Sequence, residues 1–168
     1  MLQQIQDFNK GIDPTFGELP DKKTSIYAGA AADPSCRNQR SLQNRIRKKK
    51  EAGAEFIQTQ MVMKKENLIE FCEKISNPLE IPVIAGVFLL KSYKNALFIN
   101  KYVPGANIPE KILNRLKDAK DPLQEGIRIA SEQAHDFFNI ANGIHLMAVK
   151  AEHLIPEIIE KADLSLEY

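Results

Sequence analysis

The chain has 168 residues, of which 43% are hydrophobic and 27% are charged. This composition is typical of one globular domain with a sizeable core, and it excludes a disordered chain. The formal net charge of +1 gives no overall attraction to nucleic acid or to a membrane, so any anionic partner must be held by local groups.

Apolar periodicity predicts a first helix followed by four strand–helix units. The face of this helix that includes Leu2 and Phe8 ends near Gly11, and a polar loop with Pro14 and Pro20 follows. The predicted strands are 25–32, 54–58, 81–90 and 143–149. The predicted helices that follow them are 41–52, 66–75, 93–102, 109–119, 121–141 and 152–162.

This order of elements predicts an α/β fold with a parallel sheet. Each connection between strands is long enough for a right-handed βαβ crossover, and the run 81–90, IPVIAGVFLL, suits a parallel strand covered on both faces. Four such units suit half of an eightfold barrel or a small open sheet, and spacing alone does not separate the two. The chain begins with a helix rather than a strand, as a piece of a larger fold would. A complete barrel needs about 250 residues, so the barrel interpretation implies that four units are missing.

Polar side chains end one of the predicted strands. The segment 55–60, EFIQTQ, begins as an apolar strand and finishes with Gln58, Thr59 and Gln60. Ligands of parallel α/β folds gather at the carboxyl ends of the strands, and a primary amide can read a heterocycle edge because it both donates and accepts hydrogen bonds. The alternative is that these residues solvate a loop or cap the next helix. The residues alone leave both interpretations open.

Three further segments are candidate sites, each with a plain structural alternative. Lys150 follows a strand in VKAEH (149–153), where it would neutralise a carboxylate or phosphate, or else start a helix in solvent. The small residues of AGAAAD (28–33) admit a planar ring or a pyrophosphate to the backbone, although tight helix packing explains them equally well. The run RIRKKK (45–50) is interpreted as a solvated helix end, with Lys49 nearest the inward register.

The histidines and cysteines predict neither a metal site nor a disulfide framework. His135, His145 and His153 share no zinc-type spacing, and His145 alternates with apolar residues as a core or supporting histidine would. The two cysteines, Cys36 and Cys72, are too few for a disulfide framework. The first residues, MLQQIQDFNKG, lack the charged and apolar regions expected of a targeting segment, and no apolar run approaches the roughly 20 residues of a membrane span. We therefore expect a reduced, cytoplasmic protein that binds neither nucleic acid nor membrane.

Similarity to a known family is carried by four segments. They are GAAADP (29–34), KKKEAGAEFIQTQ (48–60), IPVIAGVFLLKSYKNALFINKYVPGANIPE (81–110) and GIHLMAVKAEH (143–153). Their order and spacing resemble those of the flavin-dependent methylenetetrahydrofolate reductases. The resemblance covers only the second half of that family's catalytic barrel, from about the fifth strand to the eighth helix, in agreement with the helical start of the chain.

The resemblance implies a partial (βα)8 TIM barrel, forming a single domain over 1–168, that binds FAD. It implies reduction of 5,10-methylenetetrahydrofolate to 5-methyltetrahydrofolate in one-carbon and methionine metabolism, with NAD(P)H or another reductant as electron donor. The residues that match the family's folate contacts are Gln60 for the pterin ring, Asn95 for the substrate region and Lys150 for the folate tail. The residues that match its FAD contacts are Ala31, Lys49 and Ala54.

The resemblance also implies what the chain lacks. Leu42 falls where some members carry an acidic FAD ligand, and Ile99 falls where some carry an aromatic residue against folate. The family's catalytic glutamate and flavin-tuning aspartate belong to the half that is not present, so no catalytic residue is expected and the chain alone should be inactive. Two copies, or a partner chain with the missing half, would close the barrel and cover two unpaired sheet edges. The alternative is a non-catalytic half-barrel that binds a ligand or self-associates.

Overall fold

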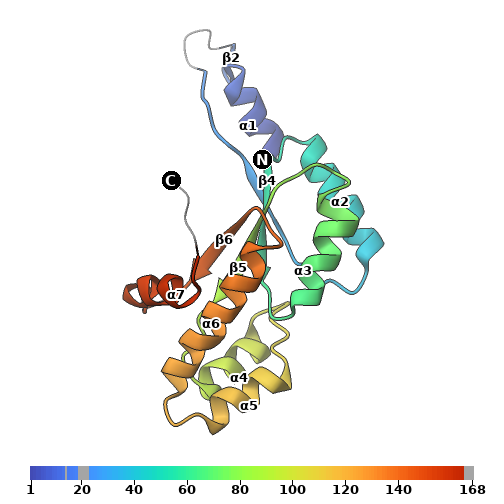
Figure 1. Ribbon diagram of the computed structural model, residues 1–168. Coiled ribbons are helices and arrows are strands. Elements are labelled where there is room, and N and C mark those ends of the chain that lie inside the picture. Colours follow the sequence, from blue (N-terminus) through green and yellow to red (C-terminus); the bar gives the residue numbers. More distant parts are fainter. Residues whose placement is uncertain (14, 19–22, 165–168) are drawn as a thin grey trace.

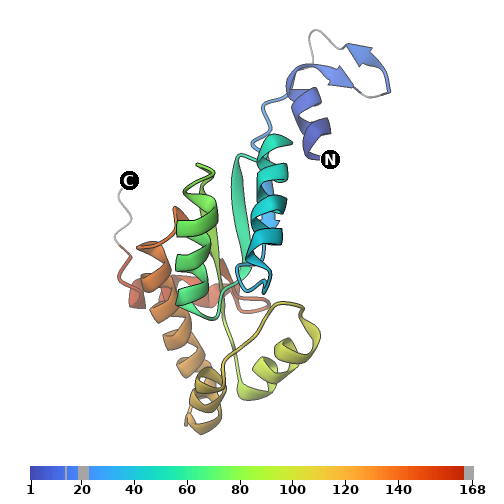
Figure 2. The same cartoon turned by 90° about the vertical axis from the view of Figure 1, so that its right-hand side faces the viewer.

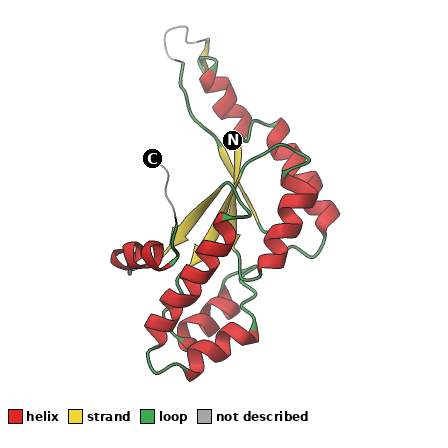
Figure 3. Cartoon of the chain, viewed as in Figure 1, coloured by secondary structure: helices red, strands yellow, loops and turns green. Residues whose placement is uncertain are grey.

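The computed structural model describes residues 1–13, 15–18 and 23–164. Its centre is a sheet of four parallel strands, which confirms the predicted α/β class and the parallel pairing (Figures 1 and 3). In spatial order the strands are β3 (Gly29–Ala32), β4 (Phe56–Met61), β5 (Val83–Phe88) and β6 (Gly143–Met147). The spatial order equals the chain order, as in successive units of a βα barrel. Because all three pairings are parallel, the four carboxyl ends lie at one edge of the sheet.

Helices connect the strands and begin at the expected signals. Ser92 caps α4 by accepting the Asn95 N–H, and Asp121 caps α6 by accepting the N–H groups of Leu123 and Gln124. The helices are α2 (Gln39–Glu51), α3 (Lys65–Phe71) with its π-helical continuation η1 (Cys72–Ser76), α4 (Tyr93–Tyr102), α5 (Glu110–Asp118), α6 (Pro122–Phe138), the 3-10 turn η2 (Glu152–Leu154) and α7 (Ile155–Lys161). Among the described helices, none has the length and apolar character needed to cross a bilayer.

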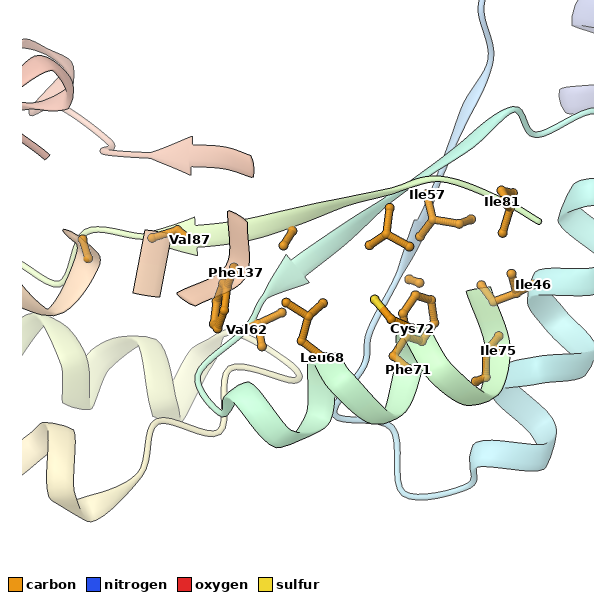
Figure 4. Close-up of a cluster of buried hydrophobic side chains, with 14 of the residues drawn as sticks. Ile46, Ile57, Val62, Leu68, Phe71, Cys72, Ile75, Ile81, Val87 and Phe137 are labelled. Carbon is orange, nitrogen blue, oxygen red and sulfur yellow. The ribbon is translucent and has the colours of Figure 1, made fainter. Parts of the chain in front are cut away.

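The main core lies between one face of the sheet and the helices packed on it (Figure 4). Alternate strand residues such as Ile57 and Val87 point into it, and Leu68 and Phe71 of α3 and Phe137 of α6 meet them there. These side chains are at most 1% exposed, so this face of the sheet is dry. Burial of this apolar surface is the main term that stabilises the fold.

Both cysteines are free thiols. Cys72 belongs to the main core (Figure 4), where burial, aided by the nearby carboxylate of Glu73, raises the pKa of its thiol to about 11. The thiol is therefore protonated at neutral pH and acts as a small apolar side chain. Cys36 is half-buried just before α2.

The opposite face of the sheet, which we call the open face, is incompletely covered. Ile84 and Phe88 of β5 and His145 of β6 are half-buried, and Gln58 of β4 is exposed. The expectation that the strand within 81–90 is covered on both faces is therefore wrong for this chain. A strand with apolar residues on both faces has the same sequence pattern whether one or both faces are covered. The pattern therefore does not reveal whether other residues pack on the open face.

A second cluster of buried side chains lies at the carboxyl edge of the sheet. Met63 and Leu90, which follow β4 and β5, pack there with Ile99 of α4, Leu116 of α5 and Ile129 of α6. This packing anchors α4 and α5 beyond the strand ends, at the bottom of the view in Figure 1. The segments that follow β4 and β5 therefore pack against α4, α5 and α6.

The N-terminal arm projects from the body of the molecule (Figure 2). It consists of α1 (Leu2–Asn9) and the short antiparallel strands β1 (Ile12–Asp13) and β2 (Gly17–Glu18). The expectation of a plain polar loop after the first helix is wrong for these two strands, and its Pro14 and Pro20 lie outside the described residues. The strand expected over 25–32 begins only at Gly29, because the pairing with β4 starts there.

Candidate functional site

The polar residues Gln58, Thr59 and Gln60 lie inside β4, which runs to Met61, and not beyond its end as the sequence suggested. The pairing of β4 with β5 shifts between Gln58 and Met61, as in a β-bulge. Thr59 is 4% exposed, and its hydroxyl accepts the Gly86 N–H at 2.9 Å while donating to the Gln60 carbonyl at 2.7 Å. Thr59 is thus a structural residue of the bulge, whereas the side chain of Gln60 stays partly accessible.

A hollow of about 680 Å³, which we call the strand hollow, lies over β3, β4 and α2. It brings together three residues expected to bind ligands, Ala31, Lys49 and Gln60. It is also lined by Gly29, Ala30, Ala32, Asp33, Leu42, Arg45, Ile46, Phe56, Gln58, Thr59 and Met147. The small side chains of 29–32 leave the β3 backbone accessible from this hollow.

Two cations meet in the strand hollow. The ammonium of Lys49 donates to the Ala31 carbonyl, so this lysine reaches from α2 to β3. Partial burial, and secondly the charge of Arg45, lowers the pKa of Lys49 below its ordinary value. The carboxylate of Asp33, which also lines the hollow, accepts the Ser35 N–H at 2.8 Å. An anionic group in the hollow would relieve the repulsion between the two cations.

The side-chain amide of Gln60 uses only part of its hydrogen-bonding capacity within the described residues. Its Oε1 accepts the Met61 N–H at 3.0 Å, which fixes the orientation of the amide. Among the hydrogen bonds of the described residues, none uses its Nε2. The amide therefore presents two N–H donors, and a second lone pair on Oε1, to a polar ring.

Asn95 and Lys150 share the carboxyl edge with Gln60 but do not line the strand hollow. The side-chain oxygen of Asn95 accepts the Lys91 N–H at 3.2 Å at the start of α4. Lys150 is exposed with φ of +56°, and the Glu152 carboxylate holds its backbone N–H at 3.0 Å. This left-handed turn after β6 directs the chain back toward η2.

Ala54 is not brought to the strand hollow. It is buried just before β4, where its N–H donates to the Lys49 carbonyl at 2.9 Å, so it lies at the amino edge of the sheet. Sequence similarity found the residue, but parallel pairing separates it from Gln60 by the length of the strand.

The structure adds a polar contact that the sequence analysis missed. The side-chain Nε2 of Gln58 lies 2.8 Å from Nδ1 of His145, on the open face and across the intervening strand β5. Gly86 pairs with His145 and has no side chain to obstruct this contact. Alternation had placed His145 in a strand, but only the register of three strands could place it beside Gln58.

Among the described residues, no three of the His, Cys, Asp and Glu side chains lie close enough together to hold a metal ion. The groups that line the strand hollow are amides, the two cations Arg45 and Lys49, the carboxylate of Asp33 and accessible backbone. Such groups can bind and orient a ligand.

Comparisons with known proteins bear on the family and the fold of the chain. The model of the family described as methylenetetrahydrofolate reductase matches residues 5–163. The Saccharomyces cerevisiae protein named methylenetetrahydrofolate reductase 2 is 29% identical over 130 residues, which are 71% of this chain and 20% of the yeast protein. The present chain thus spans about a fifth of that relative.

A solved structure shares the fold. It is described as an uncharacterized protein from Clostridium thermocellum that binds two copies of 5-methyl-5,6,7,8-tetrahydrofolic acid. The match has a TM-score of 0.60 at 21% identity and covers 80% of this chain and 51% of that one. The match therefore spans about half the length of that structure.

Proposed function

Because the chain belongs to the methylenetetrahydrofolate reductase family, we propose that it forms the folate- and flavin-binding half of such a reductase. In this proposal its four strands are strands five to eight of a (βα)8 barrel. The complete enzyme reduces 5,10-methylenetetrahydrofolate to 5-methyltetrahydrofolate through FAD, with NAD(P)H or another reductant as electron donor. The observation that carries the proposal is the convergence of Ala31, Lys49 and Gln60 on one hollow over β3, β4 and α2.

The residues of the strand hollow fit FAD chemically. Arg45 and Lys49 supply two positive charges that a pyrophosphate would balance, and partial burial, followed by the charge of Arg45, lowers the pKa of Lys49. The small residues from Gly29 to Ala32 would let the cofactor contact the β3 backbone. FAD, when bound and reduced by the electron donor, would supply the hydride for the reduction. We leave Ala54 out of this site because it lies at the opposite edge of the sheet.

Gln60 would orient the folate. Its Oε1 is anchored on the Met61 N–H, so its free amide hydrogens would point at a pterin ring, whose edge carries both donors and acceptors. Lys150, exposed on the same edge, would attract the carboxylates of the folate tail. Asn95 would support the substrate region from α4, although its Oδ1 already accepts the Lys91 N–H.

A second half-barrel would complete the fold. The accessible surface is 10414 Å², whereas a compact monomer of this mass exposes about 8,400 Å². The projecting arm and the open face both contribute to this excess. The edges β3 and β6 each have one side without a strand partner within the described sheet. We propose that a partner chain, or a second copy, covers these edges and that the partner half supplies the catalytic acid.

Two measurements on purified protein test the proposal. Flavin absorbance reports the cofactor, and light scattering reports the molar mass. Yellow protein with one FAD per pair of half-barrels would support the reductase. Failure of FAD to bind, both to the chain alone and after mixing with a cognate N-terminal half, would contradict it and favour the non-catalytic, self-associating half-barrel.

A further inference from the structure

A second hollow lies outside the proposed reductase site. It measures about 390 Å³ and is enclosed by the start of α3, by α5 and by α6. We call it the helical cleft, and it shares no lining residue with the strand hollow. The function proposed above uses none of its side chains.

The floor of the helical cleft carries an amide without a proper partner. Oε1 of Gln133 on α6 is buried and accepts no hydrogen bond from the described residues. Its Nε2 makes only a 4.0 Å contact with the sulfur of Met63, which is a weak acceptor. Buried polar groups are nearly always hydrogen-bonded, so this amide points to a missing partner that both donates and accepts.

Of the four cationic side chains that line the cleft, two form ion pairs with carboxylates of the described residues and two do not. Arg115 holds the Glu132 carboxylate with contacts of 2.6 and 2.9 Å, and Lys65 holds Asp136 at 2.9 Å. In the described part of the chain, Lys64 and Lys111 pair with no carboxylate.

Glu66 also lines the cleft and has no ion-pair partner within the described residues. Two uncompensated ammonium groups thus face one carboxylate, and the balance favours a ligand with a negative charge.

The remaining walls are apolar. Met63, Ile129 and Phe137 are at most 6% exposed, and Ile112 and Pro109 complete this side of the cleft. A ligand that satisfies all three features has an apolar or aromatic body, an amide and a carboxylate. We propose that the helical cleft is a binding site for small N-acyl amino acids. The aminobenzoyl-amino acid end of a folate has the same chemistry. Because the proposed reductase site places that end at Lys150, we commit to a free N-acyl amino acid and treat a folate tail as an outcome of the test.

The test is a titration of the full chain with N-benzoylglycine, followed by two-dimensional amide NMR. We expect shifts in residues 63–66, 109–112 and 132–137, with little change at Gln58 and Gln60. Benzoate lacks the amide and phosphate lacks the apolar body, so each should bind at least about tenfold more weakly. The same titration with 5-methyltetrahydrofolate distinguishes the sources, because a folate tail would shift both sets of residues.

Three variants make the test specific. Gln133→Met keeps the length of the side chain and removes the amide, and we expect an affinity loss of about tenfold. Lys111→Gln on the exposed surface should weaken binding about fivefold without affecting the fold. Lys117→Gln, on the same helix but away from the cleft, is the matched control and should bind normally.

Two results would overturn the proposal. One is the absence of shifts around the cleft at millimolar N-benzoylglycine. The other is equal binding by Lys111→Gln and Lys117→Gln. Neither result bears on FAD or on Gln60, so the proposed reductase function would stand or fall separately.

Discussion

Thr59 and Gly86 are joined by a side-chain hydrogen bond of 2.9 Å, in which the threonine hydroxyl accepts the glycine N–H. The bond bridges β4 and β5 at the point where their register shifts, so a side chain replaces a backbone contact of the ladder. The same hydroxyl donates to the carbonyl of Gln60. The position of Gln60 at the strand hollow therefore depends on a buried hydroxyl whose hydrogen bonds stay within the sheet.

Removing the Thr59 hydroxyl should destabilise the fold. In Thr59→Val the shape is kept but the Gly86 N–H is left buried without an acceptor, which costs about 1–3 kcal/mol. Urea unfolding followed by circular dichroism measures the change. Thr59→Ser retains the hydroxyl and should lose clearly less, so equal losses in the two variants would argue against the role of this hydrogen bond.

Gly86 should tolerate no side chain. A Cβ atom there would lie 2.9 Å from the carbonyl oxygen of Gln60 and 3.0 Å from that of Thr59. Both are backbone atoms that can move only with the strand, so we expect Gly86→Ala to cost about 1–3 kcal/mol of unfolding free energy. Gly143→Ala in β6 is the control, because its nearest neighbour would be a side-chain carbon at 3.9 Å. The prediction fails if both alanine variants unfold at the same urea concentration.

Gln60→Ala should weaken folate use while FAD is retained. In a complex reconstituted with the proposed partner half-barrel, loss of the amide should leave polar groups of the pterin unsatisfied, at a cost of about 1–3 kcal/mol in kcat/KM. Flavin absorbance of the same sample is the internal control for folding. Unchanged folate kinetics would remove Gln60 from the proposed site.

Sequence reasoning succeeded where periodicity and caps decide the structure. The existence and order of the four strands, and the helix 93–102, were predicted correctly, because apolar runs, the Ser92 cap and the break at 103–105 are local signals. The predicted end of β4 at Gln58 was too early, since Thr59 and Gln60 resemble the polar residues of a loop. Their strand conformation depends on pairing with β5, which no local pattern encodes.

The candidate site was predictable only in part. Similarity to a family named Ala31, Lys49 and Gln60, and the structure brings these three residues to one hollow. No local pattern in the sequence shows that they lie close together. The same similarity also named Ala54, which packs at the other edge. The contact between Gln58 and His145 needed the registers of β4, β5 and β6 together, so a single sequence could not reveal it.

Lowering the pH should weaken the ion pair between Arg115 of α5 and Glu132 of α6. The hydrogen bonds of Arg115 lower the pKa of Glu132, so its folded pKa lies below its unfolded one. The stability that it contributes is present above the unfolded value of about 4.3 and is lost as the pH falls through the folded pKa. Because the pair is partly exposed, the effect should stay below about 1 kcal/mol. Urea titrations between pH 3 and 7 (roughly one unit apart) should show a flatter acid limb for Glu132→Gln. Identical limbs would contradict the prediction.

Lys49 should make stability rise at alkaline pH. Burial and the charge of Arg45 lower its pKa in the folded state, so between that pKa and the unfolded value of 10.5 the unfolded chain binds more protons. Unfolding free energy therefore increases with pH across this window, and Lys49→Met should remove that part of the slope. Lys48→Met, an exposed neighbour on α2, is the control. An ADP or FAD pyrophosphate in the strand hollow should raise the pKa of Lys49 and flatten the slope of the unaltered chain in the same way. A second outcome is possible, in which Lys49→Met flattens the dependence of unfolding free energy on pH but the nucleotide does not. Lys49 would then be partly buried in the folded chain without binding the phosphates.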